Sequence, residues 1–420
     1  MKQESRVSKN DRAYLRELAK KYLDYANLPV MEERTRAWYD HNSLKGLKPM
    51  VVMEMATFES DILSGLKCGS EFSKAIEKEL LRHILNYELI NDDKVISPYF
   101  TINWDIREQG MDIQKELGED SSGRKLGYRP VHPIKDLKED FHLLKPSVFS
   151  VDREHTLEQK ALLEEIFGDI LPVKIKNSSL HWHFAPTARI IDLMGMETML
   201  YSMVDYPDEM HQLMRFLTDN LFAFVKWQEK EGLLVLNNEN DYTGAGSYGF
   251  TTELPSSGYH ENGPVTPKDL WVNMNSQESV GISPDMFGEF ISPYYHDLAG
   301  EFGSVYYGCC EPVHDIWQDY ISKLLGLRKV SISAWCNETL MGEALRGSNV
   351  IYSRKPSPNF VGVGEKLDEE AFGKYIENTL TAAKGCHVEF IFRDIYSLGG
   401  DITKPGRAVK ITRELIEKYY

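Results

Sequence analysis

The sequence predicts an α/β protein folded as a (β/α)₈ TIM barrel with an N-terminal helical extension. Short apolar or β-branched runs recur from residue 96 onward, and segments with helical periodicity separate them. Strand, helix and strand in succession imply parallel pairing with right-handed crossovers, and eight strand candidates favour a closed barrel. The eight runs are residues 98–104, 173–183, 233–238, 270–275, 304–308, 329–334, 349–353 and 388–392.

The first 95 residues have the pattern of helices. Asp11 is a suitable N-cap for an amphipathic run to Tyr22, and a second helix is expected over residues 71–85. We therefore expect residues 1–95 to form a helical cap packed on a barrel of residues 96–420, as one structural unit. The helices expected within the barrel are residues 195–203, 207–229, 283–302, 312–325, 340–346 and 369–383.

One connection differs from the others because residues 241–268 are rich in Gly, Ser and Pro and have little helical period. This composition predicts a long loop over the active face of the barrel. The Gly-rich pieces at 244–246 and 399–400 lack the order of strand, glycine loop and helix that nucleotide sites require, so we expect no nucleotide binding from them.

Composition excludes several classes of function. The 420 residues carry 64 acidic against 48 basic side chains, a net charge of −16, and no basic cluster interleaved with aromatics that could follow a nucleic-acid backbone. Residues 1–12 are polar and no window is apolar enough to cross a bilayer, so we expect a cytoplasmic protein without membrane partners. Five cysteines are too few for a secreted disulfide framework and are expected to be thiols.

Polar side chains follow each predicted strand, at the end where a parallel barrel carries its chemistry. A single cluster of this kind would only indicate capping of the next helix, but eight in register indicate a polar mouth. Alternation along a strand pairs His181 with His183, Asn273 with Asn275, and Tyr307 with Cys309 as inward-facing residues. The residues expected to bind substrate are Asn103, His181, Asn275, Tyr307 and Arg354, and those expected to act as acid or base are His183, Glu239 and Asp105.

Two of these assignments have a plain structural alternative. A histidine at the end of a strand is often only the hydrogen-bonded wall of a pocket. Arg354 and Lys355 together could bind an anionic substrate, but a solvated loop before Pro356 and Pro358 explains them equally well.

Three of the five cysteines fall between residues 309 and 336. Cys309 and Cys336 end neighbouring predicted strands, so two thiolates could face one zinc ion, and a catalytic zinc needs about three protein ligands. We predict Cys309, Cys336 and Glu278 as the ligands; Glu239, His181 and His183 are alternatives for the third position. Cys309 and Cys310 are adjacent, so only one of them is expected to bind. The competing interpretation is that these cysteines are small buried hydrophobic residues.

The sequence resembles the uroporphyrinogen decarboxylase superfamily. The segment 180–217, with His183-Phe184, Gly195-Met196-Glu197, Tyr206-Pro207-Asp208 and His211, resembles a strand end followed by the pattern G-x-E … DxPE-x-[VM]-H-x-L. Residues 281–287 resemble the LSP-x-x-F helix start of that superfamily. Residues 305–309 stand where members of its methyltransferase branch carry a strand that ends in His-x-Cys. These motifs lie within about the last 250 residues.

The resemblance implies a (β/α)₈ barrel in which zinc activates a thiol or another methyl donor or acceptor, and methyl passes to or from a cobalamin carried by a partner protein. Two residues depart from this pattern. Tyr307 replaces the histidine ligand, and Asp394 lies where the branch often has its third ligand, a cysteine. The N-terminal Arg-Gln-Ala-Gly-like segment of the porphyrinogen decarboxylases is missing, so that activity is not expected.

Three functions are compatible with these observations. The leading hypothesis is a zinc-dependent methyltransferase that moves a methyl group between a small methylated compound and a corrinoid protein. The second is a metal-free decarboxylase or lyase acting on a small carboxylated substrate, with Asp105, Glu239 and His183 as acid and base. The third is a barrel that binds a small ligand or a corrinoid partner without turnover.

Overall fold

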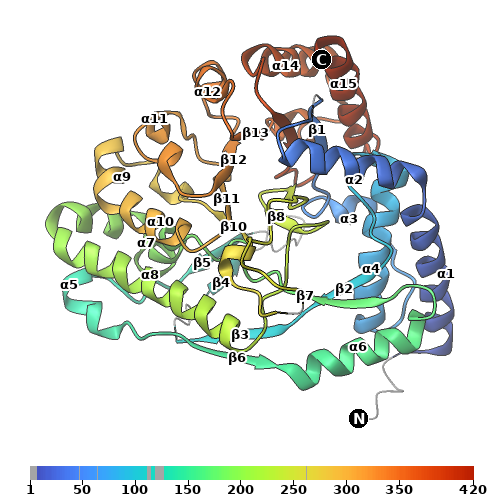
Figure 1. Cartoon of the computed structure of the whole chain (residues 1–420), viewed down its shortest axis with the longest axis horizontal. Helices are drawn as coiled ribbons and strands as arrows, with labels where there is room; N and C mark the ends of the chain where they lie inside the picture. Colours follow the sequence, from blue (N-terminus) through green and yellow to red (C-terminus); the bar gives the residue numbers. More distant parts are fainter. Residues whose placement is uncertain (1–6, 47, 64, 111–114, 119–126, 262) are drawn as a thin grey trace.

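Six parallel strands form the central sheet of the protein (Figure 1). The computed structural model describes residues 7–46, 48–63, 65–110, 115–118, 127–261 and 263–420, so part of the polar opening segment lies outside the described residues. The strand order is β1-β14-β13-β12-β11-β10, and every neighbouring pair is parallel. Their bounds are β1 Met50–Met53, β10 Trp271–Met274, β11 Ser304–Tyr307, β12 Leu327–Ile332, β13 Ile351–Arg354 and β14 Val388–Phe392.

The remaining strands form pairs. β2 (Phe100–Asn103) and β7 (Val173–Lys176) are parallel, while the other three pairs are antiparallel. A single parallel bridge joins Phe184 to Met274 beside β10. The described pairings leave β1 at one edge and β10 at the other, so the predicted α/β class with parallel strands is confirmed while closure into a barrel is not shown. The antiparallel pairs are β3 (Asp105–Gln109) with β6 (Val148–Asp152), β4 (Lys115–Gly118) with β5 (Gly127–Pro130), and β8 (Tyr242–Gly244) with β9 (Ser247–Tyr248).

Two groups of helices cover the sheet, and each has its own apolar cluster. One group, α1 (Lys9–Ala26), α2 (Pro29–Asn42), α4 (Glu71–Leu85) and α6 (Arg153–Phe167), lies on one side of the molecule (Figure 1). The other follows the later strands and contributes to the larger cluster: α7 (Pro186–Asp205), α8 (Pro207–Lys230), α9 (Pro284–Phe290), α10 (Ser292–Ala299), α12 (Glu338–Leu345), α14 (Glu369–Ala382) and α15 (Lys404–Tyr419). Four short helices complete the set: α3 (Glu59–Ile62), α5 (Leu137–Asp140), α11 (His314–Trp317) and α13 (Asn359–Gly362).

Helix α4 has the bounds that the sequence predicts, whereas α1 begins earlier than predicted. Ser8, rather than Asp11, caps α1 by accepting the Asp11 N–H. The Asp11 carboxylate instead accepts the backbone N–H of Gly69. Helix α7 bends at Gly195, where φ is +77°, and this bend marks the start of the helix predicted over 195–203. In the described part of the chain, no helix has both the length and the apolar character needed to cross a membrane.

The strand β1 lies within the segment for which the sequence predicts only helices. Its Val51 N–H donates to the Asp93 carboxylate (2.6 Å) and its Met53 N–H donates to the Asp92 carboxylate (2.7 Å). Side-chain carboxylates thus satisfy backbone donors that a further strand would otherwise accept, and they protect this edge of the sheet. Residues 1–95 therefore supply a strand of the central sheet as well as helices.

The opposite edge, β10, lacks the strand predicted over residues 233–238. That segment is irregular, and the side chain of Asn237 takes its place. The Asn237 amide accepts the Trp271 N–H (2.9 Å) and donates to the Trp271 carbonyl (3.0 Å), as a peptide group of a neighbouring strand would. A polar side chain therefore occupies the hydrogen-bonding position that the sequence analysis assigned to a strand.

The hairpin β8–β9 enters the space between the two edges of the sheet. A Cβ added to Gly244 would lie 2.4 Å from the Asn273 Cβ on β10, and one added to Gly246 would lie 2.1 Å from the Ile391 Cγ2 on β14. Both glycines have positive φ values, +100° and +89°. Only residues without a side chain can make this turn at this depth. The segment predicted as a loop over the active face therefore places its turn, at Gly244 and Gly246, against β10 and β14.

Candidate active site

A cavity of about 510 Å³ opens at the carboxyl ends of β11, β12, β13 and β14. This volume suits a small molecule, and the carboxyl ends of parallel strands are where barrel enzymes carry their chemistry. The walls combine sulfur, charged and aromatic side chains. Its lining residues are Trp182, Gln277, Cys309, Cys310, Ser333, Ala334, Trp335, Lys355, Pro356, Ser357, Pro358, Asn359, Arg393, Asp394 and Tyr396.

Two adjacent thiols lie just beyond the end of β11. Gly308 turns the chain there with φ +96°, and a Cβ at this position would lie 2.9 Å from the Ser331 Cβ. The Cys309 and Cys310 sulfurs are 3.3 Å apart, and the Cys310 thiol donates to the Asp394 carboxylate (3.3 Å). The neighbouring Cys309 sulfur, together with burial, raises the pKa of Cys310 well above its usual value. Cys310 is therefore a thiol, not a thiolate, at neutral pH.

A cationic side chain crosses one wall of the cavity. The Arg393 Nε is 3.3 Å from both the Glu54 and Asp394 carboxylates, and the guanidinium lies 4.9 Å from the centre of the Trp182 ring. Burial alone would lower the pKa of Arg393, but Glu54 raises it, so the side chain stays charged. Its Nη1 donor is buried and has no hydrogen-bond partner among the described residues. An unsatisfied donor at a cavity wall is a place where a ligand oxygen could bind.

Lys355 forms the floor of the cavity. Its ε-amino group donates to the Ser353 hydroxyl (2.7 Å) and bonds to the Tyr306 hydroxyl. Ser353 and Lys355 are two residues apart and share a face of β13, and the Lys355 N–H continues the strand register by donating to the Ile332 carbonyl. Burial lowers the pKa of Lys355 to about 7.

Beneath this floor lies a fully buried polar network centred on Glu389. Its carboxylate accepts hydrogen bonds from Ser353 (2.6 Å), Ser247 (2.9 Å) and Lys329 (3.1 Å), and the His41 Nε2 is 3.2 Å away. Burial would raise the pKa of Glu389, but the Lys329 charge and the His41 contact lower it below its usual value. Glu389 is therefore an anion whose charge is matched mainly by Lys329.

A second cavity, of about 360 Å³, collects three of the residues predicted from the sequence: Asn103, His181 and His183. The His183 Nε2 is buried without a hydrogen-bond partner in the described structure and lies 3.8 Å from Glu108, which also pairs with Arg189. Burial lowers the pKa of His181 and of His183 to about 4, so both imidazoles are neutral at pH 7. Between them, Trp182 has φ +60° and lines the first cavity.

Four other predicted residues lie outside these two cavities. Asp105 pairs with Arg107 in β3, and Glu239 is exposed. Asn275 is buried, and its carbonyl accepts from Tyr295. Tyr307 is fully buried on the outer face of β11, where its hydroxyl bonds to Ser276 (2.5 Å). Tyr306 faces inward instead, because adjacent residues of a strand point to opposite faces.

Arg354 also points away from the cavity. Its guanidinium is buried against Glu338 and Tyr375, and it donates to the carbonyls of Ile332 and Ser333. The same alternation that places Lys355 in the cavity turns Arg354 outward to the helices. The structure therefore puts Lys355, and not Arg354, in the position where a substrate could bind.

The structure does not bring the predicted zinc ligands together. The Cys336 sulfur accepts the Val313 N–H (3.4 Å) in the apolar core, while Glu278 accepts from Thr187 (2.8 Å). Cys309 instead has Cys310 as its sulfur neighbour. In the part of the chain that the structure describes, no group of three or more His, Cys, Asp and Glu is arranged to hold a metal ion. In the described residues, Cys309, Cys336 and Glu278 therefore do not form a common metal site.

The charged groups that the sequence analysis missed lie within apolar strands. Lys329 and Glu389 are fully buried within β12 and β14, where Val330, Ile332, Phe390 and Ile391 are buried apolar neighbours. A buried charge is costly unless it is paired, so a single Lys and a single Glu within two buried strands were a usable signal for a paired interior site.

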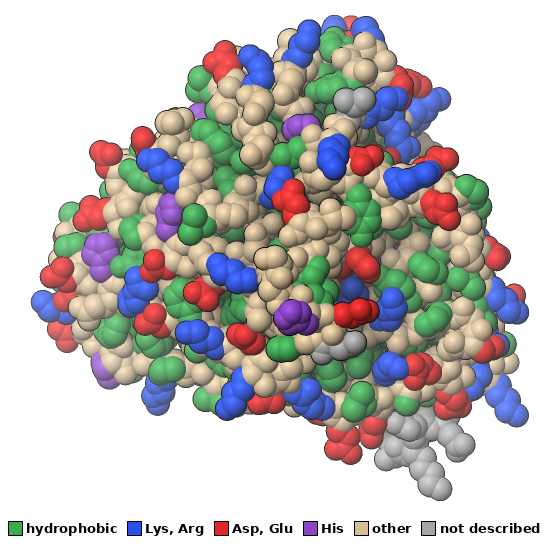
Figure 2. Space-filling model, in the orientation of Figure 1, with side chains coloured by type: hydrophobic (Ala, Val, Ile, Leu, Met, Phe, Trp, Pro, Cys, Tyr) green, Lys and Arg blue, Asp and Glu red, His purple; other side chains and the backbone are tan. Residues whose placement is uncertain are grey.

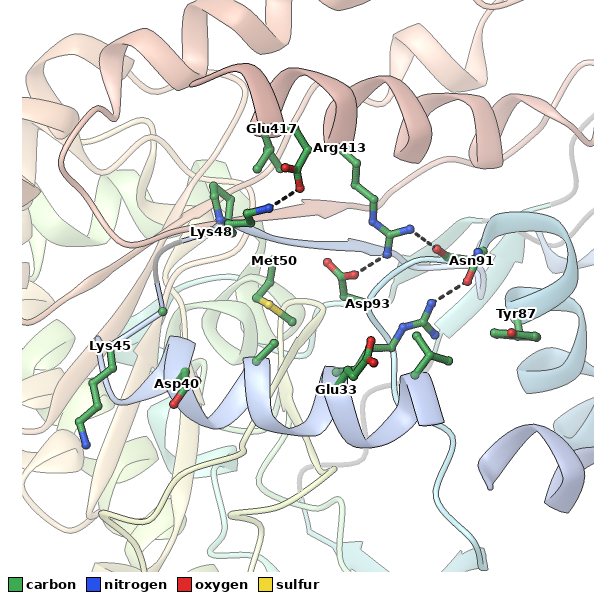
Figure 3. A pocket seen from close by; sticks show the side chains of 16 residues that line it. Glu33, Asp40, Lys45, Lys48, Met50, Tyr87, Asn91, Asp93, Arg413 and Glu417 are labelled. Atoms are coloured by element: carbon green, nitrogen blue, oxygen red, sulfur yellow. Dashed lines mark hydrogen bonds and ion pairs between the residues drawn. The ribbon is translucent and has the colours of Figure 1, made fainter. Parts of the chain in front are cut away.

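A larger cavity, of about 690 Å³, lies at the amino end of β1 between α2 and α15 (Figure 3). Its charged groups bind one another: Arg413 pairs with Asp93, Arg34 donates to Asn91, and Lys48 pairs with Glu417 (Figure 3). The amino ends of barrel strands serve stability, so we do not assign catalysis to this cavity. Figure 2 shows acidic and basic side chains intermixed over the face in view, without a continuous basic patch there.

Comparison with known proteins supports the fold. No family model matches the sequence. No curated protein sequence matches it either. Among solved structures, a methyltransferase from Methanosarcina mazei superposes with a TM-score of 0.52 over 91% of this chain and 98% of that one, at 13% sequence identity. At this identity the similarity shows a shared architecture.

Proposed function

We propose that this protein is an enzyme that moves a methyl group between a small methylated compound and a corrinoid protein. The reaction is assigned to the cavity at the carboxyl ends of β11 to β14. Two observations support this proposal. The architecture is shared with a protein described as a methyltransferase. The sequence motifs resemble the corrinoid-dependent branch of the uroporphyrinogen decarboxylase superfamily.

The observation that carries the proposal is the paired thiols beside a lysine in a cavity of small-molecule size. Cys309 and Cys310 lie 3.3 Å apart at the end of β11, and Lys355 lines the same cavity. Methyl transfer from oxygen, nitrogen or sulfur leaves charge on a poor leaving group, so a site for this reaction needs polar groups that stabilise or protonate that atom. Trp182 and Arg393 supply an aromatic and cationic wall that could orient the donor.

The predicted zinc ligands, Cys309, Cys336 and Glu278, do not converge among the described residues. The closest sulfur and carboxylate groups are Cys309, Cys310 and Asp394, and Asp394 also faces Arg393 at 3.3 Å. Elemental analysis of the purified protein and of a Cys309→Ser, Cys336→Ser variant tests the predicted set: zinc that is retained by the variant contradicts it.

The test of methyl transfer follows the absorption spectrum of cobalamin. The protein is mixed with reduced cobalamin and, in separate reactions, with anisole, trimethylamine or dimethyl sulfide as methyl donors. We expect conversion to the methylated spectrum with at least one donor, and loss of that conversion in a Cys309→Ser, Cys310→Ser variant. Cys386→Ser is the matched control, since Cys386 is buried in the core and donates to the Gly342 carbonyl. Unchanged cobalt spectra with every donor contradict the proposal.

One observation favours the alternative, a metal-free decarboxylase of a small carboxylate. The Arg393 Nη1 has no hydrogen-bond partner among the described residues and lines the same cavity as Lys355, so a carboxylate could accept from both groups. Carbon dioxide released from added carboxylic acids, without any change at cobalt, would assign the site to this reaction.

A further inference from the structure

The buried amine of Lys355 bonds to hydroxyl groups and has no carboxylate partner among the described residues. The residue is 4% exposed and lines the cavity floor. Its ε-amino group bonds to two hydroxyls, those of Ser353 and Tyr306, and it makes no direct bond to a carboxylate within the described residues. Another lysine of the interior, Lys329, differs because it pairs directly with the Glu389 carboxylate.

Burial, which the surrounding charges offset only in part, explains why the Lys355 amine loses its proton near neutral pH. The pKa of Lys355 falls to about 7 because burial, assisted by Arg393, lowers it more than Glu389, Cys309 and Glu54 raise it. The attraction of Glu389 is weakened because that carboxylate already pairs with Lys329 and contacts His41. The attraction of Glu54 is likewise divided, because Glu54 faces Arg393 at 3.3 Å. Near neutral pH, both protonation states of Lys355 are therefore populated.

We propose that Lys355 is the general acid that protonates the leaving heteroatom during methyl transfer. This inference rests on the proposed function. In the step, the bond between the methyl carbon and the donor's oxygen, nitrogen or sulfur breaks, and the methyl carbon forms its new bond to the cobalt of the reduced corrinoid. The heteroatom keeps the bonding electron pair and takes a proton from the Lys355 ammonium, which becomes a neutral amine. In the reverse direction, the same amine accepts the proton of a thiol or hydroxyl.

The surroundings of the amine suit repeated proton transfer. Ser353 links Lys355 to the Glu389 carboxylate through hydrogen bonds of 2.7 Å and 2.6 Å, which fixes the amine in position. Trp335, on the rim of the same cavity, is 76% exposed, so the cavity communicates with solvent. Water can return the proton after each turnover. A general acid with a pKa near the operating pH contributes about 10²–10⁴-fold to a rate.

The experiment compares wild-type protein with Lys355→Met and Lys355→Arg, using anisole and 4-nitroanisole as methyl donors and reduced cobalamin as acceptor. Nitrophenolate leaves without a proton far more readily than phenolate does. We expect Lys355→Met to lower the anisole rate by about 100-fold or more, and the 4-nitroanisole rate by much less. Lys355→Arg keeps the positive charge but holds its proton too tightly to donate it, so it should behave like Lys355→Met.

Lys404→Met is the matched control. Lys404 is equally buried, and burial also lowers its pKa, but it donates to the Gly364 carbonyl and does not line the cavity. This variant should leave both rates unchanged. Equal losses with the two donors in Lys355→Met, or recovery of the rate in Lys355→Arg, would overturn the general-acid assignment, because either result indicates a structural or purely electrostatic lysine.

A second readout separates this inference from the proposed function. Reductive methylation with ¹³C-formaldehyde, followed by NMR at a series of pH values, reports the titration of Lys355 without any turnover. A midpoint near 7 supports an acid–base group even if no donor is demethylated, in which case the methyl-transfer proposal alone fails. A midpoint at the ordinary lysine value overturns the Lys355 assignment, whatever the activity.

Discussion

Replacing Glu389 with Gln tests the buried network that supports the floor of the cavity. Glu389 is fully buried, and its carboxylate faces Lys329, His41, Ser247 and Ser353. A glutamine keeps one oxygen to accept hydrogen bonds, but it places an amide donor against the Lys329 ammonium and leaves that charge without a counterion. Removing one partner of a buried ion pair costs about 3–5 kcal/mol, so we expect the free energy of unfolding to fall by about that amount.

The sign of the pH dependence follows from Lys329. Burial already lowers its pKa, and loss of Glu389 lowers the folded-state pKa further. Between the lowered pKa of Lys329 in the folded variant and the ordinary lysine pKa, the unfolded chain binds a proton that the folded variant does not. In this pH range the free energy of unfolding of the variant therefore rises with pH. The deficit relative to wild type should therefore be smaller at pH 9 than at pH 6.

Urea unfolding followed by tryptophan fluorescence measures this effect. Glu417→Gln is the control, because Glu417 pairs with Lys48 at the surface, where the two side chains are 65% and 55% exposed. An exposed pair of this kind contributes less than about 1 kcal/mol. If Glu389→Gln were no more destabilising than Glu417→Gln, the buried pair would not stabilise the interior as the structure indicates.

Two further predictions concern the hairpin and the second cavity. Gly246→Ala should lower the free energy of unfolding by about 2 kcal/mol or more, because φ is +89° and the new Cβ would lie 2.1 Å from Ile391. Gly373→Ala in α14 is the control in the same urea assay. It should leave the free energy of unfolding unchanged or raise it by up to about 1 kcal/mol. Burial lowers the pKa of His183 to about 4, so the folded state resists protonation and stability should fall as pH drops from about 6.5 toward 4. In His183→Gln this decline should be shallower, and an unchanged decline would show that the imidazole is not buried as neutral.

The strands that the sequence predicts best are those with continuous apolar runs between clear turns. The run at 388–392 matches β14, and those at 304–308 and 349–353 lie within a few residues of β11 and β13. These strands are buried on both faces, which is why most of their residues are apolar or aromatic and the runs are easy to recognise. β1 was not predicted because it has only four residues, Met50–Met53, too short a run to stand out even though Gly46 and Pro49 precede it.

The pattern of apolar residues could not predict which groups bond to the two edge strands of the sheet. Asp92 and Asp93 at one edge, and Asn237 at the other, replace a strand's backbone groups with side chains. Nothing in a pattern of apolar residues indicates that a carboxylate or an amide will fill a hydrogen-bonding position of a sheet. The same reason accounts for the strand predicted over 233–238, whose apolar residues pack in the core without forming a ladder.

The cavity lies at the end of the strands where the sequence predicts a polar mouth, but only some of the predicted residues line it. The polar residues after strands placed Cys309 and Asp394 at the mouth, and both line the cavity. Arg354 and Tyr307 were chosen over Lys355 and Tyr306, and each choice was off by one residue. A shift of one residue in a strand reverses the face, and the sequence alone did not fix the register.

The measurement that bears most directly on the proposed reaction traces the methyl group itself. Anisole, trimethylamine and dimethyl sulfide carrying a CD₃ group are each incubated with the protein and reduced cobalamin, and the cobalamin is then analysed by mass spectrometry. We predict that the CD₃ label reaches cobalamin intact from at least one donor, that the demethylated donor appears in equal amount, and that Cys386→Ser transfers as wild type does. Label that remains in every donor, or reaches cobalamin equally fast with the Cys309→Ser, Cys310→Ser variant, would contradict methyl transfer at this cavity.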